Sequence, residues 1–288
     1  MVASFISARF SAVRVFNRST ASVAAAFFAS LALSTAARGA IIQEKILYRD
    51  SSGAEMEGVA VYEDNTKAPN GSKRPGVIVV HDWRGITDTT LRNAEKVAKL
   101  GYVAFAADIY GKGIRPKSPE ESGAEAGKYK GDRALFRQRE RAALDTIRKL
   151  PQVDPERIAA IGYCFGGTGV IEMARDGLDL RGVVSFHGGL DAQPLTPGAR
   201  ITAPILVLAG ADDPYQKPED LAAFEKQLRE EKADYTLVFY GGAVHSFTEK
   251  EADGTVNKGA KYDATADRRS WEAMKSFLAE VFGEKPAQ

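Results

Sequence analysis

The chain has 288 residues, of which 44% are hydrophobic and 27% are charged, a composition typical of a globular protein with a sizeable core. Its formal net charge of +1 argues against a nucleic-acid partner. A single cysteine excludes an internal disulfide and a cysteine-based zinc site, and three histidines argue against a multi-histidine metal site. We therefore expect no metal and no other cofactor.

The first 40 residues differ in composition from the rest of the chain. They contain no Asp or Glu, and Arg9, Arg14 and Arg18 precede an apolar run at 21–33 and small residues at 34–37. A basic region, a hydrophobic region too short to span a membrane, and a small-residue cleavage site follow one another as in a secretory signal. The same composition also fits a mitochondrial transit peptide. We predict that residues 1–40 are removed on export to the periplasm or the medium, or alternatively on mitochondrial import, and that 41–288 form one domain without membrane contact.

Short apolar segments alternate with amphipathic ones from residue 41 onward. In the first half, the predicted elements are a hairpin at 46–48 and 58–62, a loop at 67–75, a strand at 76–80, a helix at 87–100, a strand at 103–107, a surface excursion near the site at 112–132, and a helix at 133–150. In the second half, they are strands at 158–162, 180–186, 205–208 and 235–239, with helices at 218–231 and 270–282. This alternation predicts an α/β fold with a mostly parallel, doubly wound sheet and helices on both faces.

The strand at 158–162 runs into Gly162-Tyr163-Cys164-Phe165-Gly166 and then into a helical pattern. Glycines two residues before and after Cys164 suit a strained turn, because a side chain at either would collide with the adjoining strand or helix. A G-x-nucleophile-x-G turn exposes its central side chain at a helix N-terminus, which favours a thiolate. The alternatives are a buried structural cysteine, and a phosphate-binding loop that lacks its Lys-Ser/Thr ending here. We predict that Cys164 is a nucleophile.

Two later strands end in residues that can assist a thiol. The strand at 205–208 is followed by Asp212 and Asp213, and the strand at 235–239 by His245. Active groups of such sheets gather beyond the carboxyl ends of the strands, and the order nucleophile, acid, histidine is the one that this architecture uses. We predict that His245 transfers the proton and that Asp213, rather than the turn residue Asp212, orients it.

These motifs together resemble the dienelactone hydrolase-like proteins, the cysteine branch of the α/β-hydrolases, over about residues 41–282. The segments that carry the resemblance are 79–85, 162–167, 210–213 and 245–247. The resemblance implies an α/β-hydrolase fold, a Cys164–His245–Asp213 triad, and an oxyanion hole formed by the backbone N–H groups of Trp83 and Phe165. Our hypothesis is a monomer that cleaves small ester or lactone substrates through an acyl-thioester on Cys164.

The sequence departs from this family at two positions. Asp82 stands where the family has a glutamate that interacts with the resting thiol. Glu249 stands where the dienelactone enzymes carry an arginine for the substrate carboxylate, so a neutral ester or lactone is the expected substrate. Other acyl transfer, including thioester hydrolysis, and a non-catalytic binding module remain alternatives.

Four further residues near the predicted site have an expected place. Tyr110 and Tyr163 are predicted to line the substrate pocket. His81 and His187 also follow strands, and we interpret both as structural histidines held by strand-end hydrogen bonds.

Overall fold

A computed structural model describes residues 39–64, 73–255 and 257–284 of the chain. The predicted signal or transit peptide lies outside the described residues except for its last two positions, and so does most of the predicted loop at 67–75. Within the described ranges, no helix combines the length and the apolar character needed to cross a membrane.

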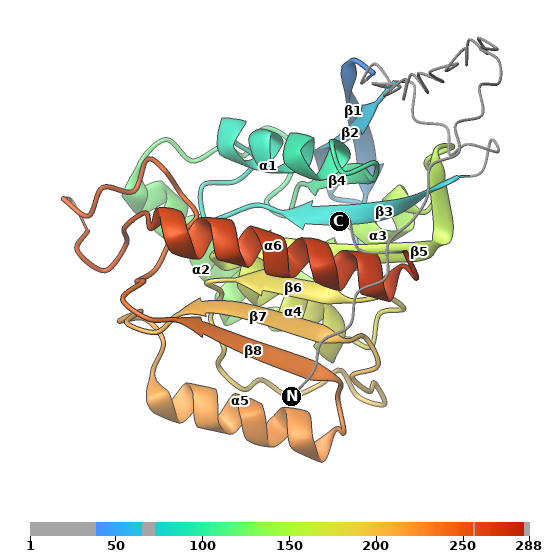
Figure 1. Ribbon diagram of the computed structural model, residues 1–288. Helices are drawn as coiled ribbons and strands as arrows, with labels where there is room; N and C mark the ends of the chain where they lie inside the picture. The colour runs from blue at the N-terminus through green and yellow to red at the C-terminus, as the bar shows by residue number, and fades with distance from the viewer. Residues whose placement is uncertain (1–38, 65–72, 256, 285–288) are drawn as a thin grey trace, which may run out of the picture. The chain divides into compact units, whose positions relative to one another are not determined.

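The described strands form one eight-stranded sheet in the order β1-β2-β4-β3-β5-β6-β7-β8 (Figure 1). Their bounds are β1 Ile41–Arg49, β2 Glu55–Glu63, β3 Arg74–Val80, β4 Val103–Ala107, β5 Val153–Tyr163, β6 Val183–Phe186, β7 Ile205–Gly210 and β8 Tyr235–Tyr240. β2 pairs antiparallel with β1 and β4, and every other neighbouring pair is parallel. The prediction of a mostly parallel sheet is confirmed, and the carboxyl ends of β3 to β8 lie along one side of it (Figure 1).

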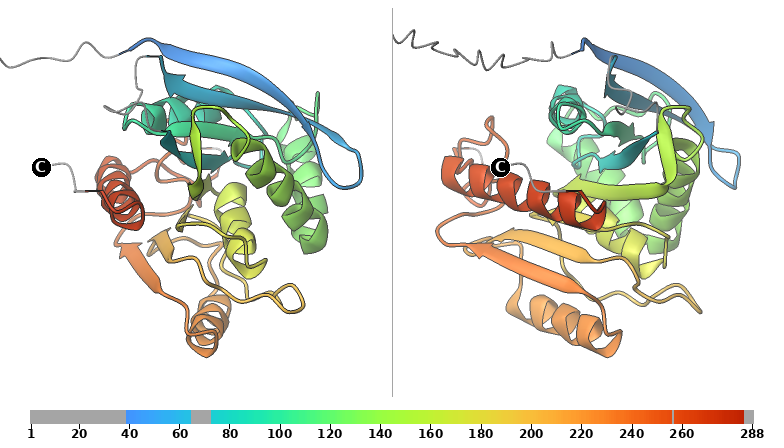
Figure 2. Two further views of the ribbon diagram at one scale, coloured as in Figure 1. Left: turned by 90° about the vertical axis from the view of Figure 1, so that its right-hand side faces the viewer. Right: turned by 45° about the vertical axis from the view of Figure 1, so that its right-hand side comes forward.

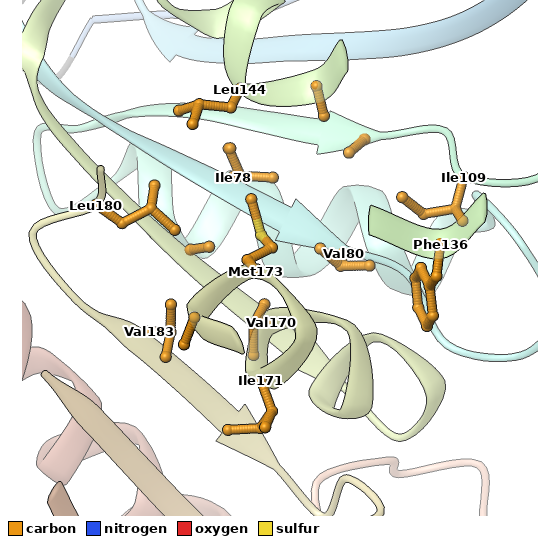
Figure 3. Close-up of a cluster of buried hydrophobic side chains, with 14 of the residues drawn as sticks. Ile78, Val80, Ile109, Phe136, Leu144, Val170, Ile171, Met173, Leu180 and Val183 are labelled. Carbon is orange, nitrogen blue, oxygen red and sulfur yellow. The ribbon is translucent and has the colours of Figure 1, made fainter. Parts of the chain in front are cut away.

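Helices cover both faces of the sheet, as predicted (Figure 2). Their bounds are α1 Asp88–Ala98, α2 Pro119–Gly131, α3 Arg133–Ile147, α4 Phe165–Arg175, α5 Pro218–Glu230 and α6 Ala264–Val281. α1 and α6 pack on one face, and α3, α4 and α5 on the other. Every residue of β3 is buried because alternate side chains enter opposite cores, and Ile78 and Val80 meet Val170 and Met173 of α4 (Figure 3).

Two segments differ most from the prediction. The surface excursion at 112–132 contains the helix α2, and α6 begins at Ala264, six residues before the predicted start at 270. Ser118 caps α2 and Pro119 occupies its first turn, a combination that starts helices in spite of the glycines that follow. In α6, Asp263 accepts hydrogen bonds from the backbone N–H groups of the first turn.

A buried ionic cluster anchors α4, the helix that follows Cys164. The Glu172 carboxylate is fully buried and accepts hydrogen bonds from Arg175 of the same helix at 2.7 Å. Arg137 of α3 donates to it from Nε at 2.9 Å and from Nη2 at 2.5 Å, and Arg133 approaches it at 3.5 Å. Three guanidinium groups around one carboxylate therefore join α4 to α3 beneath the predicted nucleophile.

The neighbouring Glu140 of α3 is fully buried, and neither of its carboxyl oxygens has a hydrogen-bond partner among the described residues. Burial raises its pKa well above the ordinary value of 4.5, and the charges of Glu172 and Asp176 raise it further. The folded protein therefore keeps a proton that the unfolded chain releases near pH 4.5. Because Glu140 ionises only in the unfolded chain, the free energy of unfolding falls as the pH rises above that value.

We expect Glu140→Gln to stabilise the protein increasingly between pH 5 and pH 8, by roughly 1 kcal/mol per pH unit until the folded protein also ionises. Urea denaturation at the two pH values measures the difference. Asp145→Asn, which removes an exposed carboxylate from the same helix, serves as the control and should show no such trend. Equal effects of Glu140→Gln at both pH values would contradict the raised pKa.

Candidate active site

Cys164 lies at the sharp turn between β5 and α4, with φ 55° and ψ −110°. A Cβ atom on Gly162 would come within 2.0 Å of the carbonyl oxygen of Gly166. A Cβ on Gly166 would come within 2.3 Å of the carbonyl oxygen of Val80. The two flanking glycines thus allow the close backbone approach that holds Cys164 in its strained conformation, as the sequence predicted.

The structure brings Cys164, His245 and Asp213 together in one chain of hydrogen bonds. His245 Nε2 lies 3.0 Å from Cys164 Sγ, and His245 Nδ1 lies 2.9 Å from Asp213 Oδ2. Asp213 Oδ1 accepts the backbone N–H of Tyr215 at 2.9 Å, which fixes the carboxylate. The neighbouring Asp212 is exposed and forms no part of this chain. The arrangement can move a proton between sulfur and imidazole.

The surroundings of His245 favour the charged form of its imidazole. Burial by itself would lower its pKa, but the negative charge of Cys164 and the hydrogen bond and charge of Asp213 outweigh burial. Together they raise the pKa of His245 to about 10. At neutral pH this pKa favours the protonated form of His245.

Residues that the sequence did not single out support His245. The backbone N–H of His245 donates to the carbonyl of Gly259, and the N–H of Lys261 donates back to the carbonyl of His245, each at 3.0 Å. The ring of Tyr215 stands edge-on to the imidazole at 5.2 Å, and its hydroxyl donates to Asn257. Tyr215 follows Asp213 by two residues, and this closeness in the sequence is the one feature that could have indicated its place in the site.

A cavity of about 470 Å³ opens at the three residues. One wall is the face of α2, which presents Gly123, Ala126, Gly127 and Lys130 at helical spacing. The opposite wall comes from the segments after β6, β7 and β8, with the aromatic ring of Tyr215 and the exposed Trp83 at its rim. The helix that sequence reasoning missed therefore forms one side of the candidate binding site.

The two residues predicted to form the oxyanion hole lie on either side of the turn that bears Cys164, one in a loop and one in α4. Trp83 lines the cavity together with Cys164, and Phe165 is the first residue of α4, where the backbone N–H has no intrahelical acceptor. The Phe165 ring points into the core and stacks on Phe136 at 4.5 Å.

Tyr110 and Tyr163 do not lie in the cavity wall, contrary to prediction. Tyr163 is buried and stacks on Phe186, because alternation along β5 turns its side chain away from the cavity. Tyr110 is buried and donates its hydroxyl to the carbonyl of Trp83 at 2.8 Å, so it supports the Trp83 backbone from behind.

Asp82 contacts an arginine in place of the thiol. Both of its oxygens accept hydrogen bonds from Arg84, whose Nε lies 3.0 Å from Oδ1 and whose Nη2 lies 2.5 Å from Oδ2. The same Nη2 lies 2.8 Å from Glu249 Oε2. Burial raises the pKa of Glu249 to about 7, helped by the charge of Asp82 and opposed by that of Arg84.

The two other histidines are held as structural residues. Nδ1 of His81 lies 2.6 Å from the carbonyl of Asp82, and its Nε2 accepts the backbone N–H of Ile109 at 3.3 Å. His187 is bonded to Thr248 at 2.8 Å through Nε2, whereas its buried Nδ1 has no partner among the described residues. Burial lowers the pKa of both rings, which keeps them neutral. The described residues include no cluster of metal-binding side chains.

Comparison with known proteins assigns the chain to a family. The sequence profile described as the dienelactone hydrolase family matches residues 62–282. The chain belongs to the dienelactone hydrolase family. Its fold is therefore the α/β-hydrolase fold, and the resemblance seen in the sequence is confirmed.

Individual family members give the same picture. A Bradyrhizobium protein described as a probable 2-oxo-3-(5-oxofuran-2-ylidene)propanoate lactonase is 32% identical over 217 residues, covering 71% of this chain and 83% of its own. The crystal structure of the dienelactone hydrolase-like promiscuous phosphotriesterase P91, from metagenomic libraries, is 37% identical with a TM-score of 0.79. A structure named m3DLH is 38% identical with the same TM-score. The alignments with these two structures cover 85% of this chain and all of theirs.

Proposed function

We propose that this member of the dienelactone hydrolase family is a carboxylic ester hydrolase that acts through an acyl-thioester on Cys164. One observation carries the proposal: the imidazole of His245 lies within hydrogen-bonding distance of both Cys164 Sγ and Asp213 Oδ2 at the mouth of a cavity. Nucleophile, proton carrier and orienting acid are then in reach of one another, as acyl transfer requires.

In the first half of the reaction, the Cys164 thiolate adds to the substrate carbonyl carbon and the C=O electron pair moves to oxygen. The N–H groups of Trp83 and Phe165 stabilise that oxyanion. When the C–O bond to the leaving group breaks, the departing oxygen takes the proton from His245 Nε2. In the second half, His245 removes a proton from water, the resulting hydroxide adds to the thioester carbonyl, and the C–S bond breaks. The carboxylic acid leaves and the thiolate is restored.

The proposed substrate is a neutral small ester or lactone. Glu249 and Arg84 are committed to each other, so neither offers a free charge to a substrate anion. Arg115 pairs with Asp108, and Lys112 lies 3.7 Å from Glu55. The residues that α2 places in the cavity wall are small apart from Lys130, and Gly123, Ala126 and Gly127 leave room for an apolar acyl or ring group. The lactonase description of the Bradyrhizobium relative favours the inclusion of lactones.

Burst kinetics combined with mass spectrometry test this proposal. With p-nitrophenyl acetate we expect a rapid release of one p-nitrophenolate per protein and an acetyl group on the peptide that contains Cys164. A panel with γ-lactones, longer esters, acyl-thioesters and a phosphotriester then ranks the leaving groups. A phosphotriester is included because the P91 relative is described as hydrolysing that class.

The panel also separates the alternatives. A strong preference for thioesters would replace ester hydrolysis by another acyl transfer. If no substrate gives a burst and none leaves an adduct on Cys164, the proposed catalysis is contradicted. The binding module then remains as the alternative.

A further inference from the structure

Two loops meet beside Cys164, and a single arginine connects them. The first follows β3, comprises residues 81–85 and carries Trp83; we call it the Trp83 loop. The second follows β8, comprises residues 245–252 and carries His245; we call it the His245 loop. Arg84 Nη2 lies 2.5 Å from Asp82 in the Trp83 loop and 2.8 Å from Glu249 in the His245 loop.

The Trp83 loop is built around this arginine. Asp82 Oδ1 accepts the backbone N–H of Arg84 at 2.8 Å and its Nε at 3.0 Å, so the carboxylate closes a tight turn around Trp83. The turn is fixed further by the hydrogen bond from the N–H of Gly85 to the carbonyl of Asp82 at 3.2 Å. Arg84 therefore belongs rigidly to the segment that bears the proposed oxyanion donor.

The His245 loop is equally rigid around Glu249. The N–H of Glu249 donates to the carbonyl of Ser246 at 2.9 Å, and the N–H of Ala252 donates to the carbonyl of Glu249 at 3.0 Å. The first of these turns begins at Ser246, the residue after His245, so we expect a displacement of Glu249 to move the imidazole.

The burial of the two carboxylates makes the link strong. The side chain of Asp82 is 3% exposed and that of Glu249 is 12% exposed, so water screens them little. Without the guanidinium, two buried carboxylates would face each other across the loops. The surface pair of Arg92 and Glu251 also reaches the His245 loop, but both side chains are more than half exposed and contribute little.

We propose that Arg84 is a positioning residue that ties the Trp83 loop to the His245 loop, fixing the separation between the oxyanion donor and the proton-transferring imidazole. The inference rests on the proposed ester hydrolysis and adds a residue that touches neither the substrate nor the thiol. Displacements of about 1 Å in such groups cost on the order of 100-fold in rate.

The surroundings of Arg84 determine how its loss depends on pH. The charged and titratable groups nearby are Asp82, Glu249, Glu251, His81 and His245. From α1, the uncharged Thr89, Thr90 and Asn93 face the cluster, and Arg92 pairs with Glu251 at the surface. Because Arg84 holds the pKa of Glu249 down, its removal raises that pKa further above about 7. A protonated Glu249 can donate a hydrogen bond to Asp82 in place of the arginine, whereas an ionised Glu249 repels it.

We therefore expect Arg84→Met to lower kcat about 10- to 100-fold at pH 9, with KM changed by less than about threefold. At pH 6 the loss should be several times smaller, because Glu249 is then protonated. The double variant Arg84→Met/Glu249→Gln should recover most of the activity at pH 9 and lose the extra pH dependence. Arg84→Lys keeps the charge but not the forked geometry of the guanidinium, so its kcat at pH 9 should lie between those of Arg84→Met and the wild type.

Arg92→Met is the matched control, since it removes an arginine that reaches the same loop at the surface, and it should leave kcat unchanged. The alkylation rate of Cys164 by iodoacetamide gives a readout that needs no ester. It should fall in Arg84→Met at pH 8 and return in the double variant, because a displaced His245 loses its 3.0 Å contact with Cys164 Sγ and can no longer activate the thiol. If the wild type hydrolyses no ester but the alkylation rates still follow this pattern, the proposed ester hydrolysis is overturned. The role of Arg84 in joining the two loops would then still stand. A pH-independent loss that Glu249→Gln does not rescue would overturn the role of Arg84.

Discussion

Replacing Cys164 by alanine is expected to lower kcat/KM for a p-nitrophenyl ester by about 10⁶-fold, because it removes the sulfur that is hydrogen-bonded to His245 and forms the proposed acyl intermediate. His245→Ala should cost a similar factor, since the leaving group then lacks its proton donor. Asp213→Asn should cost less, about 10⁴-fold, because the imidazole remains but loses its orientation and its compensating charge.

The pattern of these losses is more informative than any one of them. Because the three residues act as a unit, the double variant Cys164→Ala/His245→Ala should be no worse than either single variant. Asp212→Asn is the matched control: it removes an adjacent exposed carboxylate that does not contact His245, and its activity should equal that of the wild type. Thermal unfolding of each variant would verify that the fold persists. More than a tenth of wild-type activity in Cys164→Ala would rule out the thiol as nucleophile.

The largest expected effect on stability comes from Glu172→Gln. This change removes one negative charge from a fully buried site and deprives Arg175, which is also fully buried, and Arg137 of the carboxylate that pairs with both. Breaking a buried ion pair in this way costs about 3–5 kcal/mol. Urea denaturation should show this as a lower midpoint with an unchanged slope.

An exposed ion pair provides the comparison. Lys226 and Glu230 of α5 lie 3.6 Å apart with side chains 75% and 65% exposed, and Glu230→Gln should change stability by less than about 0.5 kcal/mol. If Glu172→Gln had an equally small effect, the arginine cluster would not be what holds α4 against α3. Because α4 begins directly after Cys164, we also expect the destabilised variant to lose activity on warming before the wild type does.

The parts of the site that could be predicted from sequence are those fixed by local chemistry. The spacing of Gly162 and Gly166 around Cys164 requires a sharp turn, because a Cβ at either glycine would collide with neighbouring backbone. Asp213 and His245 follow buried strands, and in a parallel sheet the carboxyl ends of such strands lie together. Backbone sterics and strand alternation therefore determined the fold class and the three residues that meet at the site.

The rest of the site depends on contacts that no local pattern encodes. Three glycines in α2 argue against a helix, yet Ala126 and Tyr129 pack into the core and outweigh that low propensity. The side chains of Tyr110 and Tyr163 turn away from the cavity because of their burial.

The sequence by itself determined a doubly wound sheet with a cysteine turn, an acid and a histidine at its strand ends. The tertiary structure alone decided which side chains surround them, because Arg84 and Glu249 are separated by 165 positions. Their ion pair exists only after two loops have folded against each other and excluded water, since low screening is what makes a link between distant charges strong.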